Sequence, residues 1–203
     1  MKTPARLTLV AVLLASALGA GGCVPLAATG AAVGTLAAID RRTIGAQTED
    51  QEIELRAASR IREAIKDSAG ISVTSYNRKV LLTGQAASVE DKRAAEATVG
   101  QLPNVRSIHN ELQVLGRPSF STSAADTAIT ARVKAAFVEA QDLHANVIKV
   151  ITESGNVYLM GLVSRREADR AAQVASRVAG VQRVVTVFEF ITEEDAKPRS
   201  APQ

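Results

Sequence analysis

Apolar residues recur at every fourth position in two stretches of the chain. Positions four apart lie on one face of an α-helix, so each stretch predicts an amphipathic helix with one buried side. The helices are expected over residues 53–65 and 126–138. The recurring positions are Ala57, Ile61 and Ile65 in the first stretch, and Ile129, Val133 and Phe137 in the second.

A pair of short strands is predicted after each of these helices. Residues 71–76 and 79–84 are separated by the polar pair Asn77-Arg78, which is the spacing of a β-hairpin. Residues 147–161 repeat this order around a turn at Ser154-Gly155-Asn156. Glycine and asparagine tolerate the backbone of a tight turn, so the second hairpin has the clearer signal.

A second helix and a third strand complete each unit. The helices are predicted over residues 88–102 and 164–180, and the strands over residues 104–114 and 181–191. The stretch 80–98, VLLTGQAASVEDKRAAEAT, therefore has the same pattern as the stretch 157–175, VYLMGLVSRREADRAAQVA. The fold class is α+β, with two α-β-β-α-β domains whose helices pack on a small mixed three-stranded sheet.

Two domains fit the length of the chain. They are expected at residues 52–115 and 126–192, on either side of a linker at residues 116–125 that contains Gly, Pro and Ser. Residues 193–203 are polar and rich in charge, which predicts a disordered tail.

The first residues of the chain predict export. Lys2 and Arg6 precede an apolar run at residues 7–20, and Cys23, the only cysteine, follows two glycines. This ending resembles the lipobox of bacterial lipoproteins, which implies a signal peptide over residues 1–22 and a lipidated Cys23 at the mature N-terminus. An ordinary secreted protein with a free thiol is the alternative. Acylation with several chains would anchor the protein permanently.

The segment after the cysteine is expected to be a tether, so that residues 23–51 form the lipidated N-terminus and its connection to the first domain. A second membrane span is the alternative, but the apolar stretch 24–39 has only 16 residues. Removing Lys2 and Arg6 with the signal lowers the formal charge from +3 to +1. With aromatic residues at only 3%, this balance argues against nucleic acid as a partner.

Catalytic chemistry has little support in the sequence. His109 is predicted on a strand and His144 in a loop of the other domain, and neither has a carboxylate at motif spacing. No phosphate-binding loop, metal-ligand cluster or nucleophile elbow is found in the sequence. We therefore expect no enzyme activity, no metal and no cofactor.

The repeated unit resembles the BON domain, and the chain resembles the dual-BON-domain outer-membrane lipoproteins of Gram-negative bacteria. The residues that carry this resemblance are Gly84 and Gly161 after the second strand, and Ser88 and Ser164 at the start of the second helix. The glycines are expected to be structural, through a positive φ or close packing. The resemblance implies phospholipid binding, a place in the outer membrane facing the periplasm, and links to envelope integrity, stress and division sites.

The lipid contact is expected on the outer face of the helix at residues 126–138. This face combines small apolar residues with two cations, which suits a surface at the level of anionic headgroups such as phosphatidylglycerol or cardiolipin. A periplasmic scaffold that holds envelope proteins is the alternative function. The expected contact residues are Thr127, Ala128, Ala131, Arg132, Lys134, Ala135 and Val138.

Overall fold

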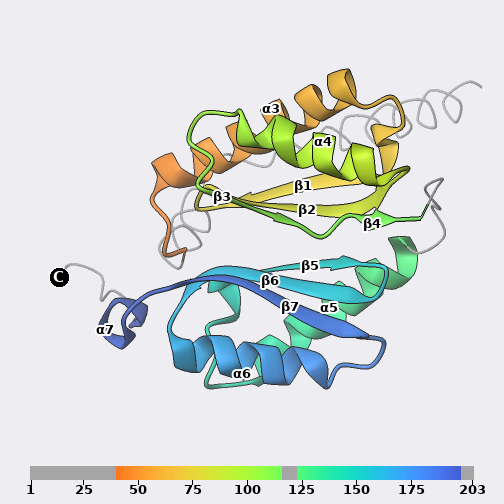
Figure 1. Cartoon of the computed structure of the whole chain (residues 1–203). Helices are drawn as coiled ribbons and strands as arrows, with labels where there is room; N and C mark the ends of the chain where they lie inside the picture. The colour runs from red at the N-terminus through yellow and green to blue at the C-terminus, as the bar shows by residue number, and fades with distance from the viewer. Residues whose placement is uncertain (1–39, 116–122, 198–203) are drawn as a thin grey trace, which may run out of the picture. The chain divides into compact units, whose positions relative to one another are not determined.

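The computed structural model describes residues 40–115 and 123–197, which contain both predicted domains. Cys23 and the signal sequence lie outside these residues. Each domain consists of two helices on one face of a small sheet, in the predicted order α-β-β-α-β, which confirms the α+β fold (Figure 1).

The first domain begins with helix α3, Ile44–Ala64, followed by the hairpin strands β1, Ile71–Tyr76, and β2, Lys79–Ala86. Helix α4, Val89–Gly100, leads to strands β3, Ser107–Asn110, and β4, Gln113–Val114. Strand β1 is antiparallel to β2, whereas β3 and β4 are both parallel to it. The expected third strand is thus divided into two short pieces.

The second domain repeats this arrangement. It contains helix α5, Ser123–Glu139, strands β5, Ile148–Glu153, and β6, Asn156–Val163, helix α6, Arg165–Ser176, and strand β7, Arg183–Phe190. Here β7 pairs with β6 without a break over eight residues, from Asn156–Arg183 to Val163–Phe190. Single turns of 3₁₀-helix, Ser68–Gly70 and Ala145–Val147, precede the two hairpins.

Both hairpins close with the same kind of turn. Asn77 and Arg78 have φ values of 50° and 67°, and Ser154 and Gly155 have values of 51° and 75°. Two consecutive left-handed residues define a type I′ turn, whose twist matches that of the flanking strands. The first hairpin forms this turn although neither of its central residues is glycine.

Several element boundaries differ from the predictions. Helix α5 starts at Ser123, so residues 123–125 belong to the helix and not to the expected linker at 116–125. Helix α3 starts at Ile44, capped by the Thr43 hydroxyl, so residues 44–51 belong to the domain and not to a tether. Helix α6 ends at Ser176, before the left-handed Gly180. Residues 193–196, expected in a disordered tail, form the short helix α7, Glu193–Ala196, which is capped by Thr192.

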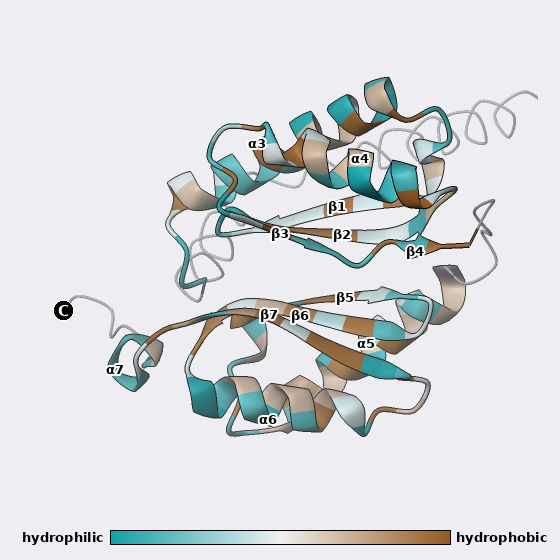
Figure 2. Cartoon of the chain, in the orientation of Figure 1, coloured by the Kyte–Doolittle hydropathy of each residue, from teal (hydrophilic) through white to brown (hydrophobic). Residues whose placement is uncertain are grey.

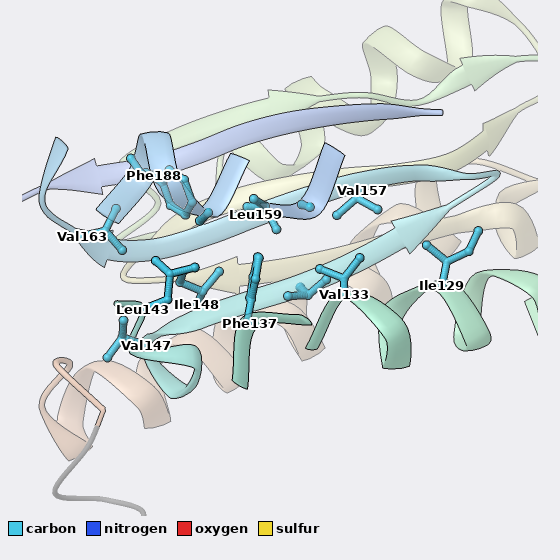
Figure 3. Close-up of a cluster of buried hydrophobic side chains, with 14 residues drawn as sticks. Ile129, Val133, Phe137, Leu143, Val147, Ile148, Val157, Leu159, Val163 and Phe188 are labelled. Carbon is cyan, nitrogen blue, oxygen red and sulfur yellow. The ribbon is translucent and has the colours of Figure 1, made fainter. Parts of the chain in front are cut away.

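Each domain has its own core between its helices and its sheet. In the second domain Val133 and Phe137 are fully buried, and Figure 3 shows both side chains directed from α5 toward the strands, near Leu159. The first core is built in the same way around Ala57 and Ile61. The predicted recurrence of apolar residues therefore marks the buried faces of both helices correctly.

The sheet faces opposite the helices also carry apolar residues. Figure 2 shows hydrophobic colour along much of the strands, whereas the helices alternate between polar and apolar. A third buried cluster joins residues of both sheets, and the Tyr76 hydroxyl donates a 3.3 Å hydrogen bond to the Val147 carbonyl. Burial and the charge of Asp40 raise the pKa of Tyr76 to about 12, so this hydroxyl stays protonated. The cluster consists of Tyr76, Leu81, Tyr158, Met160, Leu162 and Val187.

Candidate functional site

Helix α5 separates a buried face from an exposed one. Ile129, Val133 and Phe137 are 6%, 0% and 0% exposed, and they anchor the helix to the second sheet. All residues expected to contact lipid lie on the exposed side of the same helix: Thr127, Ala128, Ala131, Arg132, Lys134, Ala135 and Val138. The helix thus brings these seven residues to the surface together.

The exposed side of α5 is mostly small and apolar. Val138 is 73% exposed, and three alanines lie between it and the start of the helix on the same side. Arg132 and Lys134 have no hydrogen-bonded or ionic partner among the residues that the structure describes. Their charges are therefore available to an anion from outside the chain.

The corresponding helix of the first domain has a different surface. Arg56 pairs with Glu52, and Arg60 pairs with Glu63 at 3.6 Å, so these cations are already balanced by acids on the same helix. The surface nevertheless contains an apolar residue, because Leu55 is 73% exposed. The two helices therefore differ more in the acids that pair with Arg56 and Arg60 on α3 than in apolar content.

A buried aspartate fixes α5 to its hairpin. Asp126 is 6% exposed, and its carboxylate accepts hydrogen bonds of 2.8 Å from the backbone N–H groups of Ser154 and Gly155. A carboxylate can satisfy these turn donors, which would otherwise be buried without partners. The sequence carries a signal for this contact, namely an aspartate three residues before the first apolar position of the helix, Ile129.

The first domain has the same contact at Asp50. Its carboxylate accepts hydrogen bonds of 2.7 Å from the N–H groups of Asn77 and Arg78, and a third from the hydroxyl of Ser75. Arg42 also binds Asp50, at 2.9 Å, and lies over the ring of Tyr76. The repeated contact shows that each first helix is attached to its own hairpin turn.

Both structural glycines have a reason to lack a side chain. Gly84 has a φ of +99°, and a Cβ atom there would lie 1.9 Å from the carbonyl oxygen of Gly70. At Gly161 a Cβ atom would lie 2.7 Å from the carbonyl oxygen of Val147. The two residues share this close approach, but only Gly84 has the left-handed backbone.

The backbone of Gly84 lies beside the interruption of the third strand. Leu82 pairs with Asn110 and Gln85 pairs with Gln113, whereas the residues between them are not paired between β2 and the third strand. The N–H of Leu112 donates instead to the side chain of Asn110, at 3.3 Å. The left-handed backbone of Gly84 in β2 thus accounts for the division of the third strand into β3 and β4.

The second helices begin as predicted, with a serine cap. Ser88 accepts from the N–H of Asp91, and Ser164 forms a complete capping box with Glu167. Glu167 is only 2% exposed and also binds Arg41. Burial acts to raise the pKa of Glu167, but hydrogen bonds from Arg41 and Ser164 and the charge of Arg41 lower it below its ordinary value.

The two histidines do not form a common site. His109 lies on β3, where burial and the nearby charge of Lys79 lower its pKa. His144 precedes the 3₁₀ turn of the other domain, 3.2 Å from the carboxylate of Glu167. Within residues 40–115 and 123–197, no group of three His, Cys, Asp or Glu side chains is placed to hold a metal ion.

No helix in the described part of the chain combines the length and apolar character needed to cross a membrane.

The fold and its exposed helical surface define a protein built from two small α+β repeat domains. The chain belongs to the BON-domain family, since the model of the BON domain matches residues 49–116 and 125–192. Three relatives extend this match over most of the chain. Their similarity confirms the resemblance to dual-BON-domain outer-membrane lipoproteins.

The first relative is the outer membrane lipoprotein DolP of Haemophilus influenzae, 33% identical over 184 residues, which cover 90% of this chain and 95% of that protein. A 21 kDa hemolysin of Actinobacillus pleuropneumoniae is 34% identical over 155 residues, or 75% of this chain and 80% of that protein. The osmotically-inducible protein Y of Escherichia coli is 30% identical over 185 residues, or 87% and 92%.

Proposed function

We propose that the protein is an outer-membrane lipoprotein, anchored through an acylated Cys23, whose second domain binds anionic phospholipid at the periplasmic surface. The relative named as an outer membrane lipoprotein covers nearly the whole chain, which supports the location. The export signal and the sole cysteine support the anchor. Envelope integrity and division-site localisation are the roles that the BON resemblance implies for such a protein.

One observation carries the lipid proposal: the exposed face of α5 joins unpartnered cations to small apolar residues. Arg132 and Lys134 can approach lipid phosphates while Val138 and the alanines lie at the headgroup level. Each cation near an anionic surface contributes about 1 kcal/mol, so two cations give only weak binding. The acyl anchor keeps the domain at the membrane, where weak contacts are sufficient.

Vesicle binding tests this function with the chain that lacks residues 1–22 and carries Cys23→Ala. It should sediment with vesicles containing phosphatidylglycerol or cardiolipin, less so at high salt, and not with phosphatidylcholine alone. Arg132→Glu with Lys134→Glu should weaken binding by about thirtyfold or more, from about 2 kcal/mol of lost attraction. Arg62→Glu with Lys66→Glu, which removes two exposed cations of the first domain, is the control.

The results can also reject the proposal. Equal binding to neutral vesicles would show that phosphates are not recognised. A loss of binding in the control alone would move the contact to the first domain.

A protein scaffold is the second candidate function. Ile44 and Leu55 on α3 are 74% and 73% exposed, and such apolar residues are common in protein contacts. If lipid binding fails, crosslinking of the membrane-bound protein through residues introduced beside Leu55 would identify envelope partners.

A further inference from the structure

The cations of the second domain fall into two groups. Most of them have a carboxylate partner, and Arg165 lies over the ring of Phe190, 4.5 Å from its centre. The ion pairs are Lys149–Glu54, Arg166–Glu193, Arg170–Asp142, Arg183–Glu111 and Lys197–Glu194. In the described part of this domain, only Arg132, Lys134 and Arg177 among the Lys and Arg residues have neither a carboxylate nor an aromatic partner.

Two contacts show how α5 and α6 lie against each other. Arg170, in the first half of α6, binds Asp142, which follows the end of α5. Beyond the end of α6, a Cβ atom on Gly180 would lie 3.2 Å from Nη2 of Arg132. The helices are therefore antiparallel neighbours, with the middle of α5 beside the last turn of α6.

Helical spacing places Arg177, the C-terminal cap of α6, on the same side of that helix as Arg170. It follows Arg170 by seven residues, and residues seven apart share one face of a helix. Since Arg170 reaches the end of α5, Arg177 lies two turns further on, toward Arg132. Both Arg132 and Arg177 are exposed. On this spacing, Arg132 and Arg177 approach the same stretch of surface from the two helices.

We propose that Arg132 and Arg177 together bind the phosphodiester of one anionic phospholipid, so that the lipid site spans α5 and the last turn of α6. This inference rests on the proposed function of α5 and adds a residue from another element. Two guanidinium groups without carboxylates suit a phosphate, because each can donate parallel hydrogen bonds to its oxygens. Gly180 leaves room for the Arg132 side chain beside this phosphate.

The alternative role of Arg177 is structural, because a cation at a helix C-terminus stabilises the helix. The two roles differ in what they change. The structural role would affect thermal stability, whereas the phosphate contact affects vesicle binding and couples Arg177 to Arg132.

A double-mutant cycle on vesicles containing phosphatidylglycerol tests the proposal, with the chain that lacks residues 1–22 and carries Cys23→Ala. Arg132→Gln and Arg177→Gln should each weaken binding by about fivefold, corresponding to about 1 kcal/mol. Combined, they should weaken it by less than the product of the single effects, because the two side chains share one phosphate. Arg93 is exposed on the equivalent helix α4 and has no ion-pair or hydrogen-bond partner among the described residues, so Arg93→Gln should bind as the unmodified chain does.

Arg177→Lys should recover part of the binding, since it keeps the charge but loses the paired donors. The proposal is overturned if Arg177→Gln binds normally while Arg132→Gln binds weakly, or if the two effects simply multiply. If neither substitution changes binding, the lipid function of α5 fails as well.

Discussion

Arg41 binds Glu167 through two parallel hydrogen bonds of 2.8 Å, although the residues are 126 positions apart in the sequence. The same guanidinium donates to the carbonyl oxygens of Leu162, at 2.7 Å, and of Ala196. The segment before the first domain is thereby attached to the second helix of the other domain and to the short C-terminal helix α7.

Removing this guanidinium should destabilise the protein. In Arg41→Gln the carboxylate of Glu167 remains buried without its cation, and loss of one partner of a buried ion pair costs about 3–5 kcal/mol. Urea denaturation followed by circular dichroism measures the change. Arg166→Gln is the control, because Arg166 and Glu193 are 65% and 57% exposed and 3.6 Å apart. Equal stability of the two variants would contradict the importance of this contact.

Acid should remove the contribution of Glu167 to stability. Its pKa is lowered in the folded protein, so its carboxylate stabilises the fold above the unfolded value of about 4.3 and loses this effect as the pH falls through the folded value. The unfolding free energies of the unmodified protein and Glu167→Gln should differ at pH 7 and converge as the pH falls below the lowered pKa of Glu167 in the folded protein. A difference that does not depend on pH would assign the effect to packing alone.

Two neighbouring residues on α5 should behave in opposite ways. Phe137→Ala opens a cavity in the second core and should cost about 3–5 kcal/mol, because the side chain is fully buried. Val138→Ala should change stability by less than about 0.5 kcal/mol, since Val138 is 73% exposed. Thermal unfolding measures both. In vesicle binding, by contrast, we expect Val138→Ala to weaken the contact.

The two structural glycines should differ in their tolerance of alanine. Gly84→Ala introduces both a clash with the Gly70 carbonyl and an unfavourable left-handed backbone. Gly161→Ala introduces only a milder clash, with the Val147 carbonyl. Denaturant titration should therefore show a larger loss of stability for Gly84→Ala, and the reverse order would contradict the structure.

Maturation at Cys23 can be tested independently of the fold. Mass spectrometry of the protein extracted from membranes should find an acylated N-terminal cysteine. Cys23→Ala should release a soluble periplasmic form with both domains folded. A cysteine with a free thiol, or cleavage at another position, would exclude the lipid anchor.

The local features of the fold could be predicted from the sequence because they depend on neighbouring residues. The hairpin at Asn77-Arg78, the serine caps and the buried face with Phe137 depend on turns and on helical spacing, which are visible over a few positions. The exposed side of α5 followed from the same spacing.

Features that depend on distant residues were missed. The start of α3 belongs to the domain because Asp50 binds a turn 27 positions away. Ala196 in α7 is held by Arg41, and β4 is separated from β3 beside the unusual backbone of Gly84. The proposed pairing of Arg177 with Arg132 has no local signal in the sequence, because it depends on the packing of two helices.

The central strand β6 is buried along its whole length, and β2 is buried from Val80 to Ala86. One side of each strand supports helices, and the other contributes to the apolar cluster that joins the sheets. In the described part of the chain, neither central strand therefore offers a face on which another molecule can lie flat. Evolution of new recognition in this scaffold is confined to helix exteriors, strand edges and connecting turns, where substitutions leave both cores intact.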